Sequence, residues 1–324
     1  RLFNNRLGID FTYYVQSTTN QILPVEISEA SGYNNRLINS GEIENEGLEL
    51  MLNADIVKAG DFTWNMNING SRNKSEVVSL APGIESHTLV GIASGAIEAR
   101  VGESYGNIVG FAKKRNEEGR IVVSDIGKWQ QADERTILGN IQPDFLGGLT
   151  NTLSYRGLTL SGLIDFRIGG QIYSYSKNDQ MAKGTGKFTE DRDPEDLIVD
   201  GVIDNGDGTY RENDIVLVSH QYYAEQGPWG CIAETMVIDA DYVSLREMSL
   251  GYAFQPSVLD RTPFTRAKIS LVGRNLGYLH RDAEFELMGI SPETAYNTSS
   301  AAQGIESRGR PVTRSIGFNV NLSF

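Results

Sequence analysis

The last fourteen residues, Pro311 to Phe324, constrain the fold more than any other stretch of the chain. They read PVTRSIGFNVNLSF, and from Ile316 onward every second residue is apolar while the residues between are small or polar. Successive side chains of a β-strand point to opposite faces, so this stretch predicts a strand with one apolar and one polar face. The apolar series runs to an aromatic last residue, which is typical of a strand in a lipid-embedded barrel, although the last strand of a soluble sandwich would alternate in the same way.

Composition narrows the class of protein. The 324 residues carry a formal net charge of −13, which argues against a nucleic-acid binder, because such proteins present clusters of Lys and Arg. A single cysteine, Cys231, excludes an intrachain disulfide. No apolar run approaches the length of a transmembrane helix, whereas barrel strands need apolar residues only at alternate positions. The sequence opens at Arg1 in strand-like sequence with no leader, so we expect it to be the C-terminal part of a longer polypeptide.

Alternation of the same kind recurs along the chain and predicts eight strands. We expect them at about residues 5–18, 42–57, 61–74, 144–156, 157–173, 240–254, 266–276 and 312–324. The apolar phase changes between Leu245 and Met248, which a β-bulge would reconcile. Alternatively, the first half of that strand projects above a bilayer and escapes the lipid constraint. The opposite faces of the strands would line a watery lumen with Asp10, Glu49, Asn53, Asp55, Asn65, Asn67, Asp165 and Arg167.

The connections between these strands alternate between long and short. Long loops are expected at about 19–41, 79–143, 174–239 and 277–311, with short connections between the other strand pairs. In an up-and-down sheet this order puts every long link at one end, as in outer-membrane barrels with long extracellular loops and short periplasmic turns. The predicted fold is therefore all-β, an antiparallel up-and-down transmembrane β-barrel in the outer membrane, with its C-terminus in the periplasm.

Five blocks of sequence carry a family resemblance. They are GEIENEGLEL (41–50), TILGNIQPDFLGGLTNTLSYRGLTLSGLIDFRIGGQIYS (136–174), DADYVSLREMSLGYAF (239–254), ISLVGRNL (269–276) and PVTRSIGFNVNLSF (311–324). In this order they closely resemble SusC-like TonB-dependent outer-membrane transporters, and they match only the C-terminal third of such a transporter. The resemblance implies that this chain supplies about the last eight strands of a 22-stranded barrel that encloses a plug.

The same resemblance implies a function and a set of partners. It implies TonB-dependent active import of a nutrient, an oligosaccharide or a peptide, across the outer membrane as the barrel part of a SusC/SusD-type complex. A SusD-like surface lipoprotein would sit over the extracellular loops, and the TonB complex would act through the N-terminal part that is missing here. Outer-membrane lipid would surround the strands, and Phe324 would act as a signal to the barrel-assembly machinery. No catalysis and no cofactor are implied.

Aromatic residues in the long loops are candidate substrate contacts. Trp129, Tyr222, Tyr223 and Trp229 could stack on sugar rings or hold peptide side chains at the mouth of the lumen. They could equally pack the loops against one another or contact the capping lipoprotein.

The acidic segment DGVIDNGDGTYREND (200–214) is a weak candidate for a calcium loop through Asp200, Asp204 and Asp207. The spacing of an EF-hand fails from either Asp200 or Asp204, because Arg211 or Ile215 then stands at the position that requires a bidentate Glu. A Gly/Asp/Asn surface turn is the favoured interpretation. The three histidines are scattered without metal-ligand spacing.

Two other functions remain open from the sequence. A complete small outer-membrane barrel of about eight strands could act as an adhesin or anchor, although its interior would hold only side chains. A secreted β-sandwich hydrolase is the other alternative, but no nucleophile, acid and base stand out together in the sequence.

Overall fold

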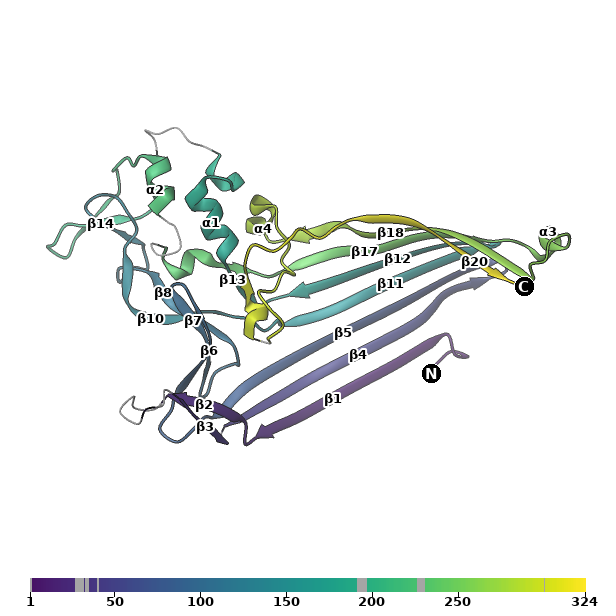
Figure 1. Cartoon of the computed structure of the whole chain (residues 1–324), viewed down its shortest axis with the longest axis horizontal. Helices are drawn as coiled ribbons and strands as arrows, with labels where there is room; N and C mark the ends of the chain where they lie inside the picture. Colours follow the sequence, from purple (N-terminus) through teal and green to yellow (C-terminus); the bar gives the residue numbers. More distant parts are fainter. Residues whose placement is uncertain are drawn as a thin grey trace.

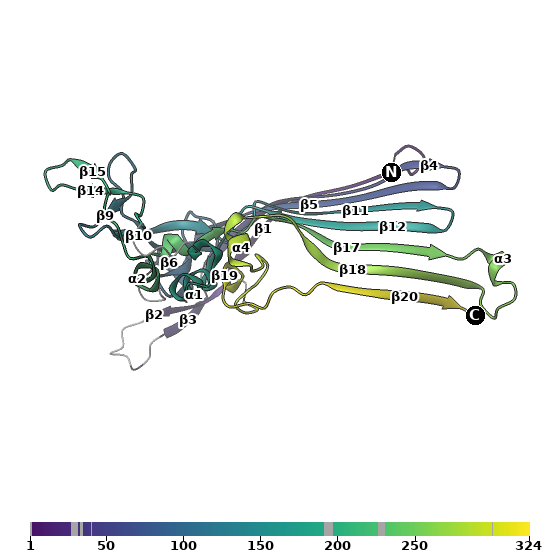
Figure 2. The same cartoon turned by 90° about the horizontal axis from the view of Figure 1, so that it is seen from above.

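The computed structural model describes residues 2–26, 32, 35–39, 41–190, 197–225, 231–299 and 301–324. The chain forms one long curved sheet, and the connections at one end of that sheet fold into a separate packed region, which we call the loop region (Figures 1 and 2).

Eight strands hydrogen-bond into the large sheet in the order β1-β4-β5-β11-β12-β17-β18-β20. Every neighbouring pair is antiparallel, which confirms the predicted eight-stranded antiparallel sheet. The strands are β1 (Leu7–Thr19), β4 (Glu42–Ala59), β5 (Phe62–Ser79), β11 (Phe145–Tyr155), β12 (Leu158–Ile168), β17 (Tyr242–Ala253), β18 (Arg266–Arg281) and β20 (Ser315–Ser323).

The large sheet does not close on itself within the described part of the chain. Its two edge strands, β1 and β20, each pair along one side only, with β4 and β18 respectively. Each edge therefore presents an unpaired row of backbone N–H and C=O groups, which a sheet in a closed barrel does not have. The open sheet counts against the complete small barrel.

Two local features modify the predicted strands. The register between β12 and β17 shifts between the pairs Leu163–Glu247 and Ile164–Leu245, which leaves Arg246 as the extra residue of a bulge and confirms the bulge predicted from the change of phase. The strand expected at 157–173 is two strands, because β12 ends at Ile168 and β13 (Gln171–Ser174) joins a different sheet. The glycines at 169 and 170 separate them, with φ values of 77° and 78°.

Short and long connections lie at opposite ends of the sheet (Figure 1). The turns after β4 and β11 and the link containing α3 (Pro256–Leu259) lie at the end where the chain begins and terminates. The four long links lie at the other end and carry secondary structure of their own, where the sequence showed no sustained period.

Four small sheets and several helices build the loop region. The small sheets have the orders β10-β8-β7-β6, β16-β13-β19, β15-β14-β9 and β2-β3. Their further strands are β2 (Ile22–Glu26), β3 (Asn35–Asn39), β6 (Ser86–Ile92), β7 (Gly95–Arg100), β8 (Asn107–Lys113), β9 (Val122–Val123), β10 (Gln131–Asn140), β14 (Val202–Asp204), β15 (Tyr210–Glu212), β16 (Val237–Asp239) and β19 (Ile305–Glu306). The helices are α1 (Tyr175–Lys183), α2 (Ser219–Glu225), α4 (Ala283–Met288) and the 3₁₀ turns η2 (Lys187–Thr189), η3 (Ala233–Met236) and η4 (Ala301–Gly304).

The hydrophobic core of the molecule lies in this loop region. One cluster joins residues from three different long links, among them Ile97, Ile108, Tyr173 and Ile305, each 0–1% exposed. A second cluster surrounds Val123 and Tyr222, and a third surrounds Phe285. Among the described residues, no helix is long and apolar enough to cross a membrane.

Candidate functional site

The two faces of the large sheet differ sharply in chemistry, and their strands are in register. On one face, called the outer face below, apolar side chains stand opposite one another from strand to strand. One such row comprises Trp64, Leu153, Leu160, Leu250, Leu271 and Phe318. Four members of this row are exposed, from 37% for Leu160 to 77% for Phe318, and Trp64 and Leu153 are partly exposed. The sheet thus carries a continuous apolar surface, and no other described part of the chain packs on it.

Polar and aromatic residues mark the limits of this apolar surface. On β4 the outer face carries Glu42, Glu44 and Glu46 near the loop region, and then Leu48 and Leu50. The hydroxyl of Tyr13 donates to Glu46 Oε1 at 3.0 Å, just where charged residues give way to apolar ones. At the opposite end of the sheet the outer face carries the aromatic residues Phe62, Tyr155, Tyr252 and Phe254. Aromatic residues at both limits of an apolar band are typical of strands that cross a membrane.

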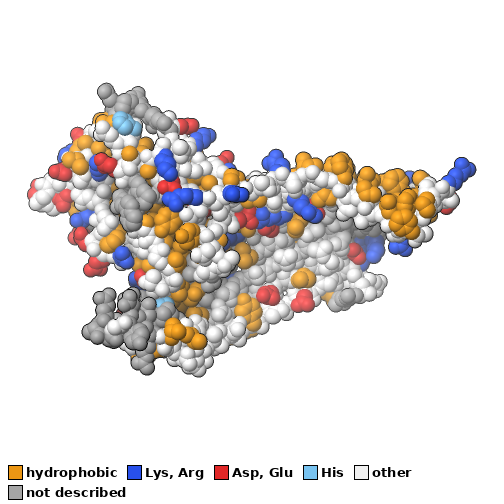
Figure 3. Space-filling model, in the orientation of Figure 1, with side chains coloured by type: hydrophobic (Ala, Val, Ile, Leu, Met, Phe, Trp, Pro, Cys, Tyr) orange, Lys and Arg blue, Asp and Glu red, His pale blue; other side chains and the backbone are white. Residues whose placement is uncertain are grey.

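The other face, called the inner face, is polar. Asn67 Nδ2 donates to Asn65 Oδ1 at 2.8 Å, and Asn65 Nδ2 donates to Asp55 Oδ1 at 3.0 Å. Asn53 donates to Asn67, which extends this amide chain by one more residue. In the space-filling view the middle of the sheet is mostly free of hydrophobic side chains, while hydrophobic side chains gather along the β18–β20 edge (Figure 3).

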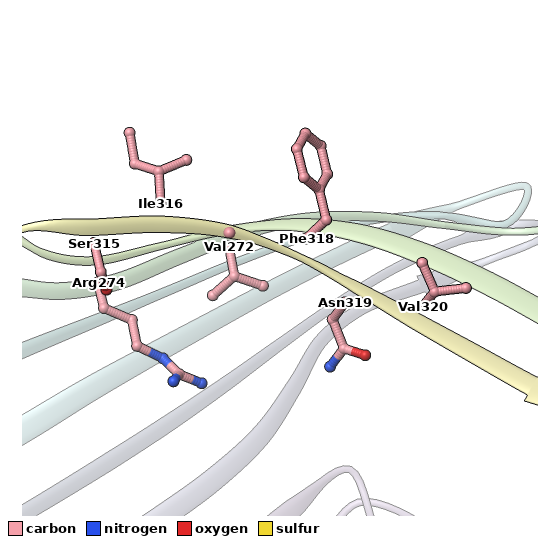
Figure 4. Close-up of a pocket in the computed structure, with 8 residues that line it drawn as sticks. Val272, Arg274, Ser315, Ile316, Phe318, Asn319 and Val320 are labelled. Carbon is pink, nitrogen blue, oxygen red and sulfur yellow. The ribbon is translucent and has the colours of Figure 1, made fainter.

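The close-up of β20 shows the same division at the level of side chains. Ile316 and Phe318 project to one side of the strand, whereas Asn319 and the neighbouring Arg274 project to the other (Figure 4). Arg274 Nε donates to Glu247 Oε2 at 2.8 Å on the inner face.

A network of charged and phenolic groups joins the inner face to the last long link. The bulged Arg246 donates through Nε to Asp165 Oδ1 at 2.7 Å and through Nη1 to Glu293 Oε2 at 2.8 Å. Tyr278 donates to the same Glu293 oxygen at 2.8 Å, and the ring of Tyr242 lies 5.6 Å from the Arg246 guanidinium. The carboxylates on both sides neutralise Arg246, so this network stabilises the contact between the sheet and the last long link.

Three of the loop aromatics predicted as substrate contacts lie together. The rings of Trp129 and Tyr222 are 5.9 Å apart, and those of Tyr222 and Tyr223 are 5.6 Å apart. Tyr222 is only 2% exposed and burial raises the pKa of its phenol, so its side chain packs the loops together. Trp129 and Tyr223 are partly exposed and stay predicted ligand contacts. Trp229 lies outside the described residues.

A cation that the sequence gave no reason to single out belongs to this cluster. Lys113 Nζ lies 3.7 Å from the centre of the Trp129 ring, and burial lowers the pKa of that amine. Lys113 lies on β8, and only the folding of two separate links places its partner Trp129 next to Tyr222.

The weak calcium candidates serve the turn between β14 and β15. Asp204 Oδ1 accepts the Gly206 N–H at 2.8 Å, and Asp207 Oδ1 accepts the Thr209 hydroxyl at 2.6 Å, which lowers the pKa of Asp207. The backbone carbonyl of Asp200 accepts the Trp129 indole N–H at 3.2 Å. Within the described ranges, no three His, Cys, Asp or Glu side chains are placed to hold a metal ion together.

Two other residues singled out in the sequence occupy contrasting places. Phe324 is 85% exposed, and its ring lies 5.2 Å from that of Phe264. Cys231 is buried in the loop core, where its sulfur lies 3.4 Å from the Ser94 hydroxyl.

Comparisons with known proteins support a relationship over the whole chain. The TonB-dependent receptor P3 of Formosa agariphila is 26% identical over 352 aligned residues, which cover 100% of this chain and 33% of the receptor. The TonB-dependent receptor SusC of Bacteroides thetaiotaomicron is 21% identical over 266 residues, covering 78% of this chain and 25% of SusC. No protein-family model matches the sequence.

Solved structures show the same fold. The RagAB peptide transporter aligns with a TM-score of 0.69 at 18% identity over 99% of this chain and 34% of the transporter chain. The RagAB peptide importer in its open-open state aligns with a TM-score of 0.68 at 19% identity. The eight-stranded sheet thus aligns with part of the RagA barrel.

The chain spans about one third of the length of the curated relatives it matches. Those relatives are receptors rather than enzymes, in agreement with the prediction that no catalysis takes place here. The chain is a homologue of the SusC-like TonB-dependent receptors.

Proposed function

We propose that this chain forms the closing wall, about the last eight strands, of a 22-stranded TonB-dependent importer in the outer membrane. The outer face contacts lipid, the inner face lines the lumen, the loop region lies outside the cell and the C-terminus lies in the periplasm. The observation that carries this proposal is the set of apolar rows in register from strand to strand of the sheet, with no other described part of the chain packed over them.

The two free sheet edges support a wall rather than a complete pore. β1 and β20 would each pair with further strands of the same barrel, which would satisfy their unpaired backbone groups. Phe324 would be read by the assembly machinery, and its deletion is expected to lower the amount of barrel in the outer membrane.

The partners and cargo follow from the relatives. We propose a SusD-like lipoprotein over the loop region, energy supplied by the TonB complex through a part outside this chain, and a peptide or an oligosaccharide as cargo. The likeness to the RagAB peptide importer supports a peptide, and the likeness to SusC supports the wider class of SusC/SusD-type systems.

A lipid-contact experiment tests the placement of the two faces. In the full-length protein with Cys231 replaced by Ser, a fluorophore is attached to a single cysteine at position 250 or 249, and the protein is reconstituted with lipids that carry a quencher in their acyl chains. Leu250 lies on the outer face and Ser249 on the inner face, so we expect quenching at 250 only. Equal quenching at both positions, or none at 250, contradicts the membrane wall.

An uptake experiment tests transport itself. Cells that lack the gene are expected to lose growth on limiting peptides or on limiting oligosaccharides, and cells that lack TonB are expected to show the same loss. Unchanged growth on both kinds of nutrient contradicts import, whatever the lipid-contact result.

A further inference from the structure

A cavity of about 260 Å³ lies where the inner face meets the loop region. Asn73 of β5 and Arg167 of β12 form its sheet side, and Gln142 and Gln303 come from two different long links. Ile141, Pro143 and Leu146 add apolar surface to this lining. The cavity therefore combines amide groups, an apolar part and one positive charge.

Backbone oxygens hold the guanidinium of Arg167 in place. Its Nη2 donates to the carbonyl of Ile141 at 2.8 Å, and its Nε lies 3.4 Å from the carbonyl of Gly169. A Cβ at Gly170 would lie 2.7 Å from Arg167 Nη2 and 2.8 Å from the carbonyl of Gln142. The missing side chain at Gly170 thus provides the room in which the guanidinium sits.

Arg167 has no carboxylate partner among the described residues. Tyr242 and Asp241 act on it electrostatically, but Asp241 Oδ1 accepts the Gly169 N–H at 2.5 Å. The contrast with Arg246 is clear, because that residue is paired with both Asp165 and Glu293. A half-buried guanidinium that donates only to backbone carbonyls is suited to a carboxylate, which it can bind with two parallel hydrogen bonds.

A second cavity of about 250 Å³ extends the first one across the inner face. The two share Asn73 and Gln142, and the second reaches Thr18 on β1. Its lining carries no charged side chain. Tyr14 donates to Asn73 Oδ1 at 2.9 Å and Asn73 Nδ2 donates to Asn45 Oδ1 at 3.1 Å, so the amides along this groove are held in fixed orientations.

We propose that the two cavities form one ligand groove in which Arg167 binds the carboxylate of a short polar chain. The inference rests on the proposed function and names the chemistry of its cargo: amide or hydroxyl groups along the neutral part and a carboxylate at the Arg167 end. An acidic peptide and an oligosaccharide that contains a uronic acid both present this chemistry.

The test measures binding by calorimetry to the full-length transporter with its partner. The probes are a tripeptide ending in Glu, trigalacturonate, and two neutral counterparts, the tripeptide amide ending in Gln and maltotriose. Binding of at least one acidic probe is expected, and which one binds identifies the source of the carboxylate. Arg167→Met is expected to weaken that binding at least tenfold and to leave any binding of its neutral counterpart unchanged.

Two further variants keep the test decisive. Arg167→Lys keeps the charge without the planar fork and should restore part of the affinity, and it replaces Arg167→Met if that variant fails to assemble. Arg274→Met is the control, because Arg274 faces the same lumen but is paired with Glu247 and more exposed. Failure of both acidic probes to bind the wild type, or equal weakening by Arg167→Met and Arg274→Met, overturns the inference. Lipid contact and TonB-dependent uptake would then still support the proposed importer.

Discussion

The large sheet and the loop region distribute their apolar side chains in opposite ways. In the loop region Ile97, Ile108 and Phe285 are 0% exposed, whereas on the sheet Phe11 and Phe318 are 62% and 77% exposed. The loop region buries its apolar surface against itself, as a water-soluble domain does. The sheet is a single layer and leaves its apolar surface for its surroundings to cover.

This difference separates two sources of stability. Apolar contacts within the protein stabilise the loop region, so truncating its core should cost folding free energy directly. The sheet is stabilised by strand pairing and, in the proposed importer, by lipid. Matched substitutions in the two regions should therefore affect different measurements. A substitution in the loop core should lower the stability of the loop region, and one on the sheet should lower the amount of assembled barrel.

The largest effect is expected for Phe285→Ala in α4. This ring is 0% exposed among Ile172, Ile238 and Met288, and its loss should cost about 3–5 kcal/mol through lost contacts and a cavity. The loop region should then exchange its amide hydrogens faster and become sensitive to protease in intact cells. Phe318→Ala is the control, because Phe318 belongs to none of the three core clusters of the loop region. Its loss should leave the amide protection of the loop region unchanged. Equal loss of loop protection in both variants contradicts the separation of the two regions.

The next effect is expected for Leu250→Arg on the outer face. A charge in the middle of the apolar band should cost about 2–4 kcal/mol in lipid, whereas Ser249→Arg places the same charge on the polar inner face. The measurement is the amount of folded, heat-modifiable barrel in outer-membrane fractions. Leu250→Arg should reduce it strongly and Ser249→Arg should not, and the reverse order would mean that the faces are assigned wrongly.

The sequence was sufficient for the sheet because each of its strands has different surroundings on its two faces. A period of two then appears directly in the residues, and the change of phase before Met248 even indicated the bulge at Arg246. The glycine pair at 169–170 was the available signal for the end of β12, which the continued apolar alternation masked.

The same reasoning could not find the strands of the loop region. β7 and β8 are buried on both faces, so their sequences GAIEAR and NIVGFAK show no alternation. The properties of the site residues are even harder to predict from the sequence. Arg167 was predicted to line the lumen, but its lack of a carboxylate partner depends on Ile141 and the fold of two distant links. Likewise, only tertiary structure brings Trp129 and Tyr222 together.

A smaller effect is expected for Glu306→Gln, which tests how the last long link is tied to α1. Glu306 is 0% exposed, and its carboxylate accepts the hydroxyls of Ser174 and Ser176 at 2.6 and 2.7 Å and the backbone N–H of Ser176 at 3.2 Å. Glutamine has the same size but loses the charge-assisted hydrogen bonds, and its NH₂ group faces groups that themselves donate. The loss of folding free energy should be about 1–3 kcal/mol. Thermal unfolding of the loop region should shift to lower temperature, while assembly of the sheet stays normal. An unchanged unfolding temperature would show that this buried carboxylate is not needed to hold the last long link against α1.

The smallest effect is expected for Asp179→Asn on the same helix. Arg308 donates to Asp179, and this hydrogen bond lowers the pKa of the carboxyl below its ordinary value of about 4. A lowered pKa in the folded state means that the pair stabilises the loop region above about pH 4 and that this contribution is lost as the pH falls through the lowered pKa. Because Arg308 is largely exposed, the gain should be at most about 1 kcal/mol. Asp179→Asn should therefore lower the unfolding temperature slightly at pH 7 and have no effect once the pH is below the lowered pKa, since the wild-type carboxyl is then protonated too. A difference that grows toward acid pH would show that Asp179 acts through something other than its charge.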